Sequence, residues 1–466
     1  METFPQARVL PDMKKISFGL VLFLALLITA SAGAAAPPGS LDPGFGHGGR
    51  IVRATDLGGQ PWSVARTQTA TLPDGRFVLL AGNSLYGFLA NGAIVRAFGA
   101  GEGPVPVPAG YELEATGIAA DASGRVVVVG TLRAADGAER ALVVRYTAAG
   151  DLDPAFGDRG VLVTDFGLPP RRDPEGSPPL TQVQVAGVAV DSQDRIVLSG
   201  TRTRMVGPCR ASSNLVYADA FAARLDAAGR LDSSFGDKGI ARMFEVARVG
   251  SPVLDSGDGV YVTTPYGGRG PCTEPHYDRL VGHLDAAGRP DTGFGEGGWI
   301  SLPFPRRTVA VTTVLGPDDT LLLVESRWAK RPARKVVKVR RLLSDGALDD
   351  RFGRNGAATI SAPSRTLEAA AAAVDSAGRI LVTGTAANLR KPKQRRFFLG
   401  RLTASGRPDR SFGRGGLTIT GWGKGAEAVG GSVLLQPGRA VVAGTASSRI
   451  FSNGSGLVLA GYRLGP

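Results

Sequence analysis

Short apolar runs alternate with turns rich in Gly and Asp along most of the chain. One stretch shows the order well: an apolar run from Glu368 to Val374, the turn DSAG, the segment Arg379 to Gly384, a variable loop, Phe397 to Leu402, the turn PDRSFGRGG, and Leu417 to Thr420. Four β-prone runs joined by such turns predict a four-stranded antiparallel meander.

The meander recurs with a period of about 60 residues. Its last turn appears as LDPGFGHGG (41–49), LDPAFGDRG (152–160), LDSSFGDKG (231–239), PDTGFGEGG (290–298), LDDRFGRNG (348–356) and PDRSFGRGG (408–416), and in decayed form as IVRAFGAGE (94–102). Its second strand appears seven times, as GRFVLLAG, GRVVVVG, DRIVLSG, DGVYVTT, DTLLLVE, GRILVTG and GRAVVAG. Self-similarity at a fixed period predicts a repeat architecture.

The two ends of the chain complement each other. The last repeat has three strands, finishing with Leu457 to Leu464, and its missing turn and fourth strand stand near the N-terminus, in Leu41 to Val52. An N-terminal strand that completes the last sheet removes the open edges of an unclosed array. The sequence therefore predicts an all-β fold, a single seven-bladed β-propeller of four-stranded antiparallel blades over residues 35–466.

The pattern RLxxxGxxDxxFGxxG, followed by a DxxGRIVVxG strand, resembles the delta-60 repeat family and covers nearly the whole chain after its N-terminal segment. The resemblance implies a secreted bacterial propeller-like protein, and it implies little about biochemical activity. The first repeat departs from the pattern, with Val95 in place of the Asp and Glu102 in place of the second Gly, so we expect an irregular first blade.

The N-terminal segment has the layout of a signal peptide. Met13-Lys14-Lys15 precedes an apolar run from Ile16 to Ile28 and a stretch of small residues, and we place the signal peptide at 1–34 with Met13 as an alternative start. A retained membrane anchor is the alternative, but this apolar run is shorter than the roughly 20 residues that span a bilayer. We expect export to the periplasm, the cell surface or the medium.

Each good copy of the turn carries an Asp three residues before a Phe. The pairs are Asp42 and Phe45, Asp153 and Phe156, Asp232 and Phe235, Asp291 and Phe294, Asp349 and Phe352, and Asp409 and Phe412. A short Asp side chain accepts hydrogen bonds from backbone amides in turns, an interpretation we favour over a ring of metal-binding carboxylates. The Phe is predicted to fill the space between neighbouring blades.

A cation recurs at one position of the third strand. The residues are Arg145, Arg224, Arg341, Arg401 and Arg463, with His283 at this position in the fourth repeat. We predict that each cation pairs with the Asp of the turn. The alternative is a ring of cations that faces a ligand.

The sequence shows little catalytic chemistry. Its three histidines, His47, His276 and His283, are too scattered for a His-rich metal site, and it has no Gly-x-Ser-x-Gly, HExxH or P-loop motif. We therefore expect a binding scaffold that is not an enzyme and needs neither cofactor nor metal. The alternative is a propeller-fold carbohydrate-active hydrolase or lyase with two carboxylates in a central pocket.

The formal net charge of +13 is concentrated in two loops that join the second and third strands of the fifth and sixth repeats. The candidate ligand-binding residues are Arg327, Trp328, Lys330, Arg331, Arg334, Lys335, Arg390, Lys391, Lys393 and Arg395. A basic rim of this kind suits an anionic polysaccharide, an envelope polymer or a lipid surface, and a protein partner remains an alternative. The plainer alternative is a solvated, charge-rich hairpin pair on a monomer.

The two cysteines, Cys209 and Cys272, lie one repeat apart, each preceded by Gly-Pro. This spacing predicts equivalent positions in neighbouring blades, and an exported protein is not kept reduced. We predict a disulfide bond between them, with two independent thiols as the alternative.

Overall fold

The computed structural model describes residues 36–55, 67–95, 102–168, 182–209, 212–245, 248–264, 278–303, 308–329, 333–447, 451 and 455–465. Residues 37–466 form one compact unit. The predicted signal peptide lies outside the described residues. Among those residues, no helix has both the length and the apolar character needed to cross a membrane.

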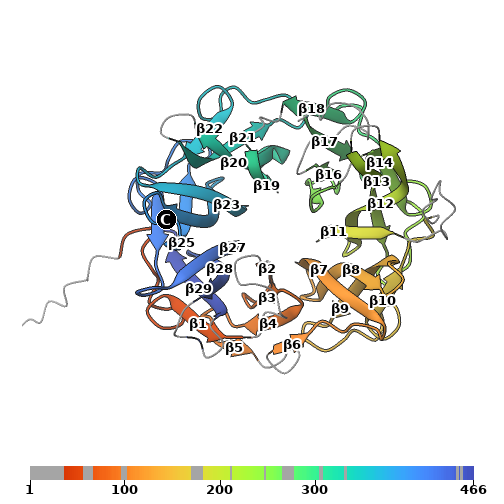
Figure 1. Cartoon of the computed structure of the whole chain (residues 1–466), viewed down its shortest axis with the longest axis horizontal. Coiled ribbons are helices and arrows are strands. Elements are labelled where there is room, and N and C mark those ends of the chain that lie inside the picture. Colours follow the sequence, from red (N-terminus) through yellow and green to blue (C-terminus); the bar gives the residue numbers. More distant parts are fainter. Residues whose placement is uncertain are drawn as a thin grey trace, which may run out of the picture. The chain divides into compact units, whose positions relative to one another are not determined.

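The described strands form seven antiparallel sheets arranged as the blades of a propeller (Figure 1). Blade 1 contains β2 (Thr67–Thr71), β3 (Phe77–Ala81), β4 (Ser84–Phe88), β5 (Ile94–Val95) and β6 (Glu102–Pro104). Blade 2 contains β7 (Tyr111–Ala120), β8 (Val126–Ala134), β9 (Glu139–Tyr146) and β10 (Val161–Thr164), and blade 3 contains β11 (Val183–Val190), β12 (Ile196–Cys209), β13 (Ser212–Leu225) and β14 (Ile240–Glu245).

Blade 4 contains β15 (Val253–Leu254), β16 (Val260–Thr263), β17 (Asp278–Leu284) and β18 (Trp299–Pro303), and blade 5 contains β19 (Thr308–Leu315), β20 (Leu321–Ala329), β21 (Arg334–Leu342) and β22 (Ala357–Ile360), with the 3-10 turn η2 (Pro317–Asp319) between its first two strands. Blade 6 contains β23 (Arg365–Val374), β24 (Ile380–Asn388), β25 (Arg395–Leu402) and β26 (Leu417–Thr420). Blade 7 contains β27 (Glu427–Gln436), β28 (Arg439–Ser447) and β29 (Ser455–Arg463), completed by β1 (Arg50–Ala54).

The seven-bladed, all-β prediction is confirmed, including the closure of the ring by the two ends of the chain. Strand β1 pairs with β29 in antiparallel register, from Arg50 opposite Ala460 to Ala54 opposite Gly456. The expected irregularity of blade 1 is also present, because β5 has two residues and β6 pairs with β4 beside it.

Both faces of a blade are buried against its neighbours, which explains why the strands read as nearly continuous apolar runs. In blade 5, Leu321 and Leu323 pack with Tyr261 of blade 4, whereas Leu322 and Val324 pack with the core shared with blade 6. Because successive side chains alternate, odd-numbered residues of β20 face blade 4 and even-numbered ones face blade 6.

The Phe of the repeated turn fills the seam between two blades. Phe45, Phe156, Phe235, Phe294, Phe352 and Phe412 are fully buried, and Phe98 of the decayed copy lies outside the described residues. The ring of Phe352 in blade 5 packs on Gly406 in a turn of blade 6, where a Cβ would lie 2.8 Å from the ring. Only glycine fits this contact.

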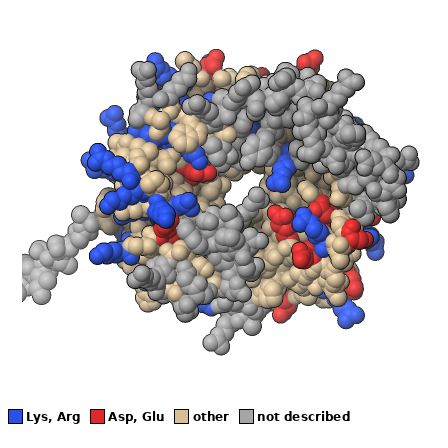
Figure 2. Space-filling model, viewed as in Figure 1, with Lys and Arg blue, Asp and Glu red and all other residues tan. Residues whose placement is uncertain are grey.

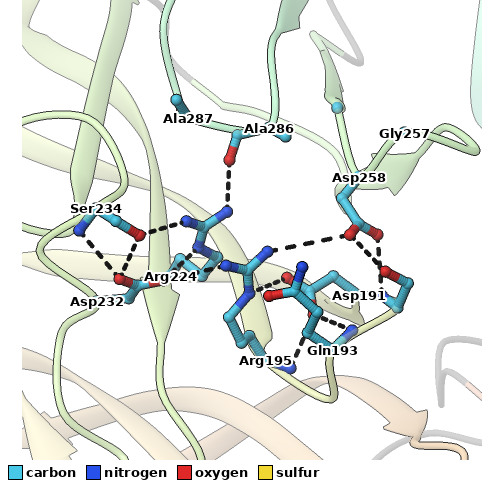
Figure 3. A network of polar contacts seen from close by, with 12 residues as sticks. Asp191, Gln193, Arg195, Arg224, Asp232, Ser234, Gly257, Asp258, Ala286 and Ala287 are labelled. Carbon is cyan, nitrogen blue, oxygen red and sulfur yellow. Dashed lines mark hydrogen bonds and ion pairs between the residues drawn. The ribbon is translucent and has the colours of Figure 1, made fainter.

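The predicted pairing of the third-strand arginine with the turn aspartate is present in blades 2, 3, 5 and 6. In blade 3, Arg224 Nε lies 2.8 Å from Asp232 Oδ2, while its Nη1 donates to the carbonyl of Ala286 in blade 4 at 2.6 Å (Figure 3). Asp232 Oδ1 accepts the backbone N–H of Ser234, so the carboxylate also holds its own turn. In blades 3, 5 and 6 the arginine thus ties its turn to the next blade.

In blades 4 and 7, a residue other than a third-strand arginine is the close partner of the turn aspartate. His283 takes the arginine position in blade 4, with Nδ1 2.8 Å from Asp291 Oδ2 and Nε2 2.8 Å from Asp255 Oδ2. In blade 7, Arg463 stays 3.7 Å from Asp42, and Arg439 of β28 makes the close pair instead.

Candidate functional site

The predicted basic residues lie at the tips of two hairpins, β20 and β21 in blade 5 and β24 and β25 in blade 6. Lys330 and Arg331 lie outside the described residues. Figure 2 shows Lys and Arg side chains gathered at the left, over blade 6, whereas the Asp and Glu side chains at the lower right are interspersed with Lys and Arg. The cations described on this face therefore cluster over blade 6.

The blade 6 tip presents its charges to solvent. Arg390, Lys391 and Lys393 are exposed, and none of the three makes an ion pair within the described part of the chain. Asn388 Oδ1 accepts the backbone N–H groups of Arg390 and Lys391 at 2.9 and 3.2 Å. The turn is fixed through its backbone, and the three charged side chains extend into solvent.

The cations described at the tip of blade 5 already contact blade 6 or the segment that leads to it, whereas the ring of Trp328 is exposed. Arg334 donates to the carbonyl of Pro363 at 2.9 Å, and Lys335 Nζ lies 2.9 Å from Glu368 Oε2 on the innermost strand of blade 6. Trp328, opposite Lys335 in the register, is 43% exposed, and the Lys335 ammonium sits 5.7 Å from its ring centroid. We call Trp328, Lys335, Glu368, Arg390, Lys391 and Lys393 the rim patch.

Arg327 belongs to a different group, because its side chain faces blade 4. Its Nε lies 2.6 Å from Oε2 of Glu325, which is fully buried, and Arg340 Nη2 lies 2.5 Å from Glu325 Oε1. Arg279 of β17, fully buried in blade 4, approaches Glu325 Oε1 at 3.7 Å. Lys338 stands directly opposite Glu325 in the register of β20 and β21. We call these five residues the seam cluster.

Burial and mutual repulsion disfavour the charged forms of several cations in the seam cluster. Burial lowers the pKa of Arg279 to about 10, with the nearby charges of Arg340 and Arg327 acting in the same direction and Glu325 against them. Burial also lowers the pKa of Arg327 and of Lys338, and each is pushed further by a neighbouring arginine. Among the described residues, Glu325 is the one carboxylate that makes an ion pair with these cations.

Glu325, Arg279 and Arg340 could not be predicted as a group from the sequence. The signal available was Glu325 itself, a carboxylate inside the apolar run LLLVES of the second strand. Its partner Arg279 comes from another repeat, and a linear pattern does not give the distance between the two.

Two further expectations concern metals and catalytic carboxylates. Within the described ranges, no cluster of three or more His, Cys, Asp or Glu residues could hold a metal ion. A hollow of about 360 Å³ lies at the turns of blade 5, lined by Asp318, Arg341, Asp345 and Asp349 among others. Its Asp349 already pairs with Arg341 at 2.6 Å, as in the other repeats.

Cys209 is the last residue of β12, and Cys272 lies outside the described residues. The disulfide between them stays a prediction.

Comparison with known proteins adds a family match over part of one repeat. Residues 122–156 match the model of a family described as "Domain of unknown function (DUF5122) beta-propeller". This segment runs from the first turn of blade 2 to Phe156, so the wider assignment to the delta-60 repeat family stays a prediction. A search of curated proteins finds no match.

Similar solved structures include several enzymes that act on carbohydrates. A Hadza microbial sialidase is 12% identical, with a TM-score of 0.39 over 84% of this chain and 73% of its own. The polysaccharide lyase Uly1 is 10% identical, with a TM-score of 0.35 over 78% and 91%. A thermostable family-43 glycoside hydrolase is 12% identical, with a TM-score of 0.31 over 64% and 95%.

The expectation that the chain is not an enzyme is contradicted by the three similar structures named above, which are structures of enzymes. The expectation rested on the lack of a local motif, and catalytic groups of a propeller can come from blades far apart in the sequence. At these identities and TM-scores, the similarity assigns no substrate, reaction or residue to this chain.

Proposed function

We propose that the rim patch binds an anionic polysaccharide. The observation that carries the proposal is the set of three exposed cations on blade 6, Arg390, Lys391 and Lys393, which have no ion-pair partner among the described residues. Their charges attract a polyanion and give the binding a salt dependence, because exposed charges are screened by added ions.

The exposed tryptophan on the neighbouring blade favours a sugar polymer. The exposed face of Trp328 offers a flat apolar surface with a polar surround, and Glu368 supplies a half-exposed carboxylate next to Lys335. A carboxylate accepts hydrogen bonds from sugar hydroxyl groups but repels the closely spaced phosphates of nucleic acid or of an anionic lipid surface. A saccharide with widely spaced acidic groups fits both features.

The test is a binding titration of residues 35–466 with polygalacturonate, with dextran as the neutral control polymer. We expect binding to polygalacturonate that weakens as NaCl rises, and none to dextran. The triple variant Arg390→Ser, Lys391→Ser, Lys393→Ser should lose roughly tenfold or more in affinity, since three contacts of about 0.5 kcal/mol each are removed.

A matched control removes the same charge from the opposite ends of the strands. Arg159, Lys238 and Arg414 are exposed residues of the repeated turns between third and fourth strands, and their replacement by Ser should leave the affinity unchanged. If both triple variants lose the same affinity for polygalacturonate, the net charge of the protein explains the binding and the rim patch is rejected as the site. Following new reducing ends in the same mixtures shows whether the bound polymer is also cleaved.

A further inference from the structure

The seam cluster between blades 4 and 5 is separate from the rim patch and poses a problem of charge. Beside the buried Arg279, three cationic groups, Arg327, Lys338 and Arg340, come together with one carboxylate of the described residues, Glu325. Like charges held together away from water raise the free energy of the folded state unless anions balance them. Glu325 can neutralise one of these three charges.

Three arginines approach the two carboxylate oxygens of Glu325. Its Oε1 faces Arg340 at 2.5 Å and Arg279 at 3.7 Å, and its Oε2 faces Arg327 at 2.6 Å. Within the described ranges no carboxylate forms an ion pair with Lys338, although this lysine lies opposite Glu325 on the same face of the hairpin. The Lys338 ammonium therefore adds a positive charge beside Arg327 with no counter-charge of its own in the described ranges.

Lys338 and Arg327 are partly exposed to solvent, and the Arg340 side chain is less exposed than that of Arg327, at 13%. The Arg327 side chain is 25% exposed and Lys338 is half-buried, whereas Arg279 and Glu325 are fully buried. Burial and the charge of Arg327 both lower the pKa of Lys338, so the two cations repel each other in place. The outer part of the seam thus combines an ammonium that makes no ion pair in the described ranges with a guanidinium that is 25% exposed.

We propose that the outer part of the seam cluster is an oxyanion site, in which Lys338 and Arg327 directly bind a sulfate, phosphate or carboxylate group. A guanidinium offers paired N–H donors that match two oxygens of such a group, and an ammonium adds a point charge. Arg340 and Arg279 act behind them as positioning residues, because they hold Glu325 and Glu325 holds Arg327. The bound anion restores the charge balance of the seam and clamps blade 4 to blade 5.

The test is thermal unfolding of residues 35–466 in sodium sulfate, sodium phosphate and sodium chloride at equal ionic strength. A ligand that binds the folded state raises Tm, so sulfate and phosphate should raise the Tm of the wild type by roughly 1 to 3 °C above chloride. Sulfate also stabilises proteins through exclusion from their surface, and the variant Lys338→Met measures that general contribution. We expect the extra rise to disappear in Lys338→Met and to persist in Lys338→Arg.

If sulfate raises the Tm above its value in chloride by the same amount in the wild type and in Lys338→Met, the proposal is overturned. We call this rise in Tm the sulfate increment. Lys338→Met removes a repelled charge, so it should remain folded and be no less stable in chloride, which keeps the comparison valid. The triple rim variant at Arg390, Lys391 and Lys393 should retain the full sulfate increment, so a failed rim patch and a failed seam site give different results.

The source of the oxyanion is distinguished by the polymer titration. If an acidic group of the polysaccharide occupies the seam, Lys338→Met weakens polygalacturonate binding several-fold and free sulfate competes with the polymer. If the ligand is a free inorganic anion, polymer affinity is unchanged in Lys338→Met while the sulfate increment is still lost. Either result, together with the lost increment, supports an oxyanion at Lys338.

Discussion

Arg439 of β28 forms an ion pair with Asp42, which stands 397 positions earlier in the chain, with Nε 2.6 Å from Oδ2. The same guanidinium donates to the carbonyl of Ala90 in blade 1 at 2.8 Å and lies over the buried ring of Phe45. One side chain therefore joins blade 7, the N-terminal closing segment and blade 1.

Replacing Arg439 by Met should lower the free energy of unfolding by about 2 kcal/mol, because the Asp42 carboxylate and the Ala90 carbonyl lose a charged donor in a mostly buried place. Urea unfolding followed by fluorescence measures this change. The control is Arg159→Met, whose side chain is almost fully exposed, and it should leave the urea midpoint nearly unchanged. A midpoint of Arg439→Met equal to that of the control would show that closure does not depend on this contact.

The choice of Arg439 over Arg463 has a local cause. In blades 2, 3 and 6, the arginine that begins the second strand pairs with an aspartate four residues earlier, as Arg379 does with Asp375 at 2.7 Å. In blade 7 that turn reads Gln436-Pro-Gly-Arg439 and has no aspartate, so Arg439 is available to the turn that the N-terminal segment supplies.

A second prediction concerns the glycine that receives the Phe352 ring. Gly406 has φ +79°, and a Cβ there would lie 2.8 Å from the ring and 2.8 Å from the backbone nitrogen of Gly353. Gly406→Ala should destabilise the fold by about 2 to 4 kcal/mol, through backbone strain and overpacking of the seam.

Gly415→Ala separates the two contributions. Gly415 has φ +66°, and a Cβ there would have no atom within 4 Å, so this variant keeps the backbone strain without the clash. It should cost about 1 kcal/mol in urea unfolding. Equal costs at the two positions would show that the Phe352 contact tolerates a methyl group.

A third prediction concerns acid unfolding. Burial alone would raise the pKa of Asp409, but hydrogen bonds from Ser411 and the charge of Arg401 outweigh it and hold the pKa below its ordinary value. The pKa values of Asp42, Asp232, Asp255 and Asp349 are lowered for similar reasons. A folded-state pKa below the unfolded one gives stability that is complete at neutral pH and is lost as the pH falls below about 4.

The urea midpoint should therefore stay nearly constant from pH 7 to pH 5 and fall steeply below about pH 4. Asp409→Asn should start from a lower midpoint at pH 7 and lose less of it on acidification, since one of the titrating carboxylates is gone. Parallel pH profiles for the wild type and Asp409→Asn would exclude a contribution from this carboxylate.

Much of this fold could be predicted from the sequence because every blade repeats one set of short-range patterns. The Asp and Phe of LDxxFG sit three residues apart, and the arginine that pairs with Asp153 lies eight residues before it, so local spacing already places these side chains together. The closure could be predicted because the repeat that lacks its last strand and the segment that supplies it stand at opposite ends of the chain.

The sites were harder to predict because they depend on which face of a blade a side chain occupies. Arg327 and Trp328 are adjacent in sequence, and the charge pattern predicts one basic loop for both. In the structure, Arg327 contacts Glu325 on the side of blade 4, whereas Trp328 contacts Lys335 on the side of blade 6. The number of charges along a loop does not show which cations are paired with a residue of the next blade. Lys335 is paired in this way, whereas Lys393 is exposed.

The last prediction tests the charge balance of the seam cluster. Glu325→Gln leaves Arg279, Arg327 and Arg340 without their shared carboxylate in a buried place, and breaking a buried ion pair in this way costs about 3 to 5 kcal/mol. Glu368→Gln, which breaks the half-exposed pair with Lys335, should cost less than about 1 kcal/mol.

Adding Lys338→Met to Glu325→Gln should recover part of the loss, because it removes one of the mutually repelling charges that the carboxylate no longer offsets. Denaturant unfolding of the two single variants and the double variant gives the interaction energy directly. If the two changes in the free energy of unfolding are strictly additive, Lys338 has no electrostatic interaction with Glu325. The seam cluster would then consist of Glu325 and its three arginines, without Lys338.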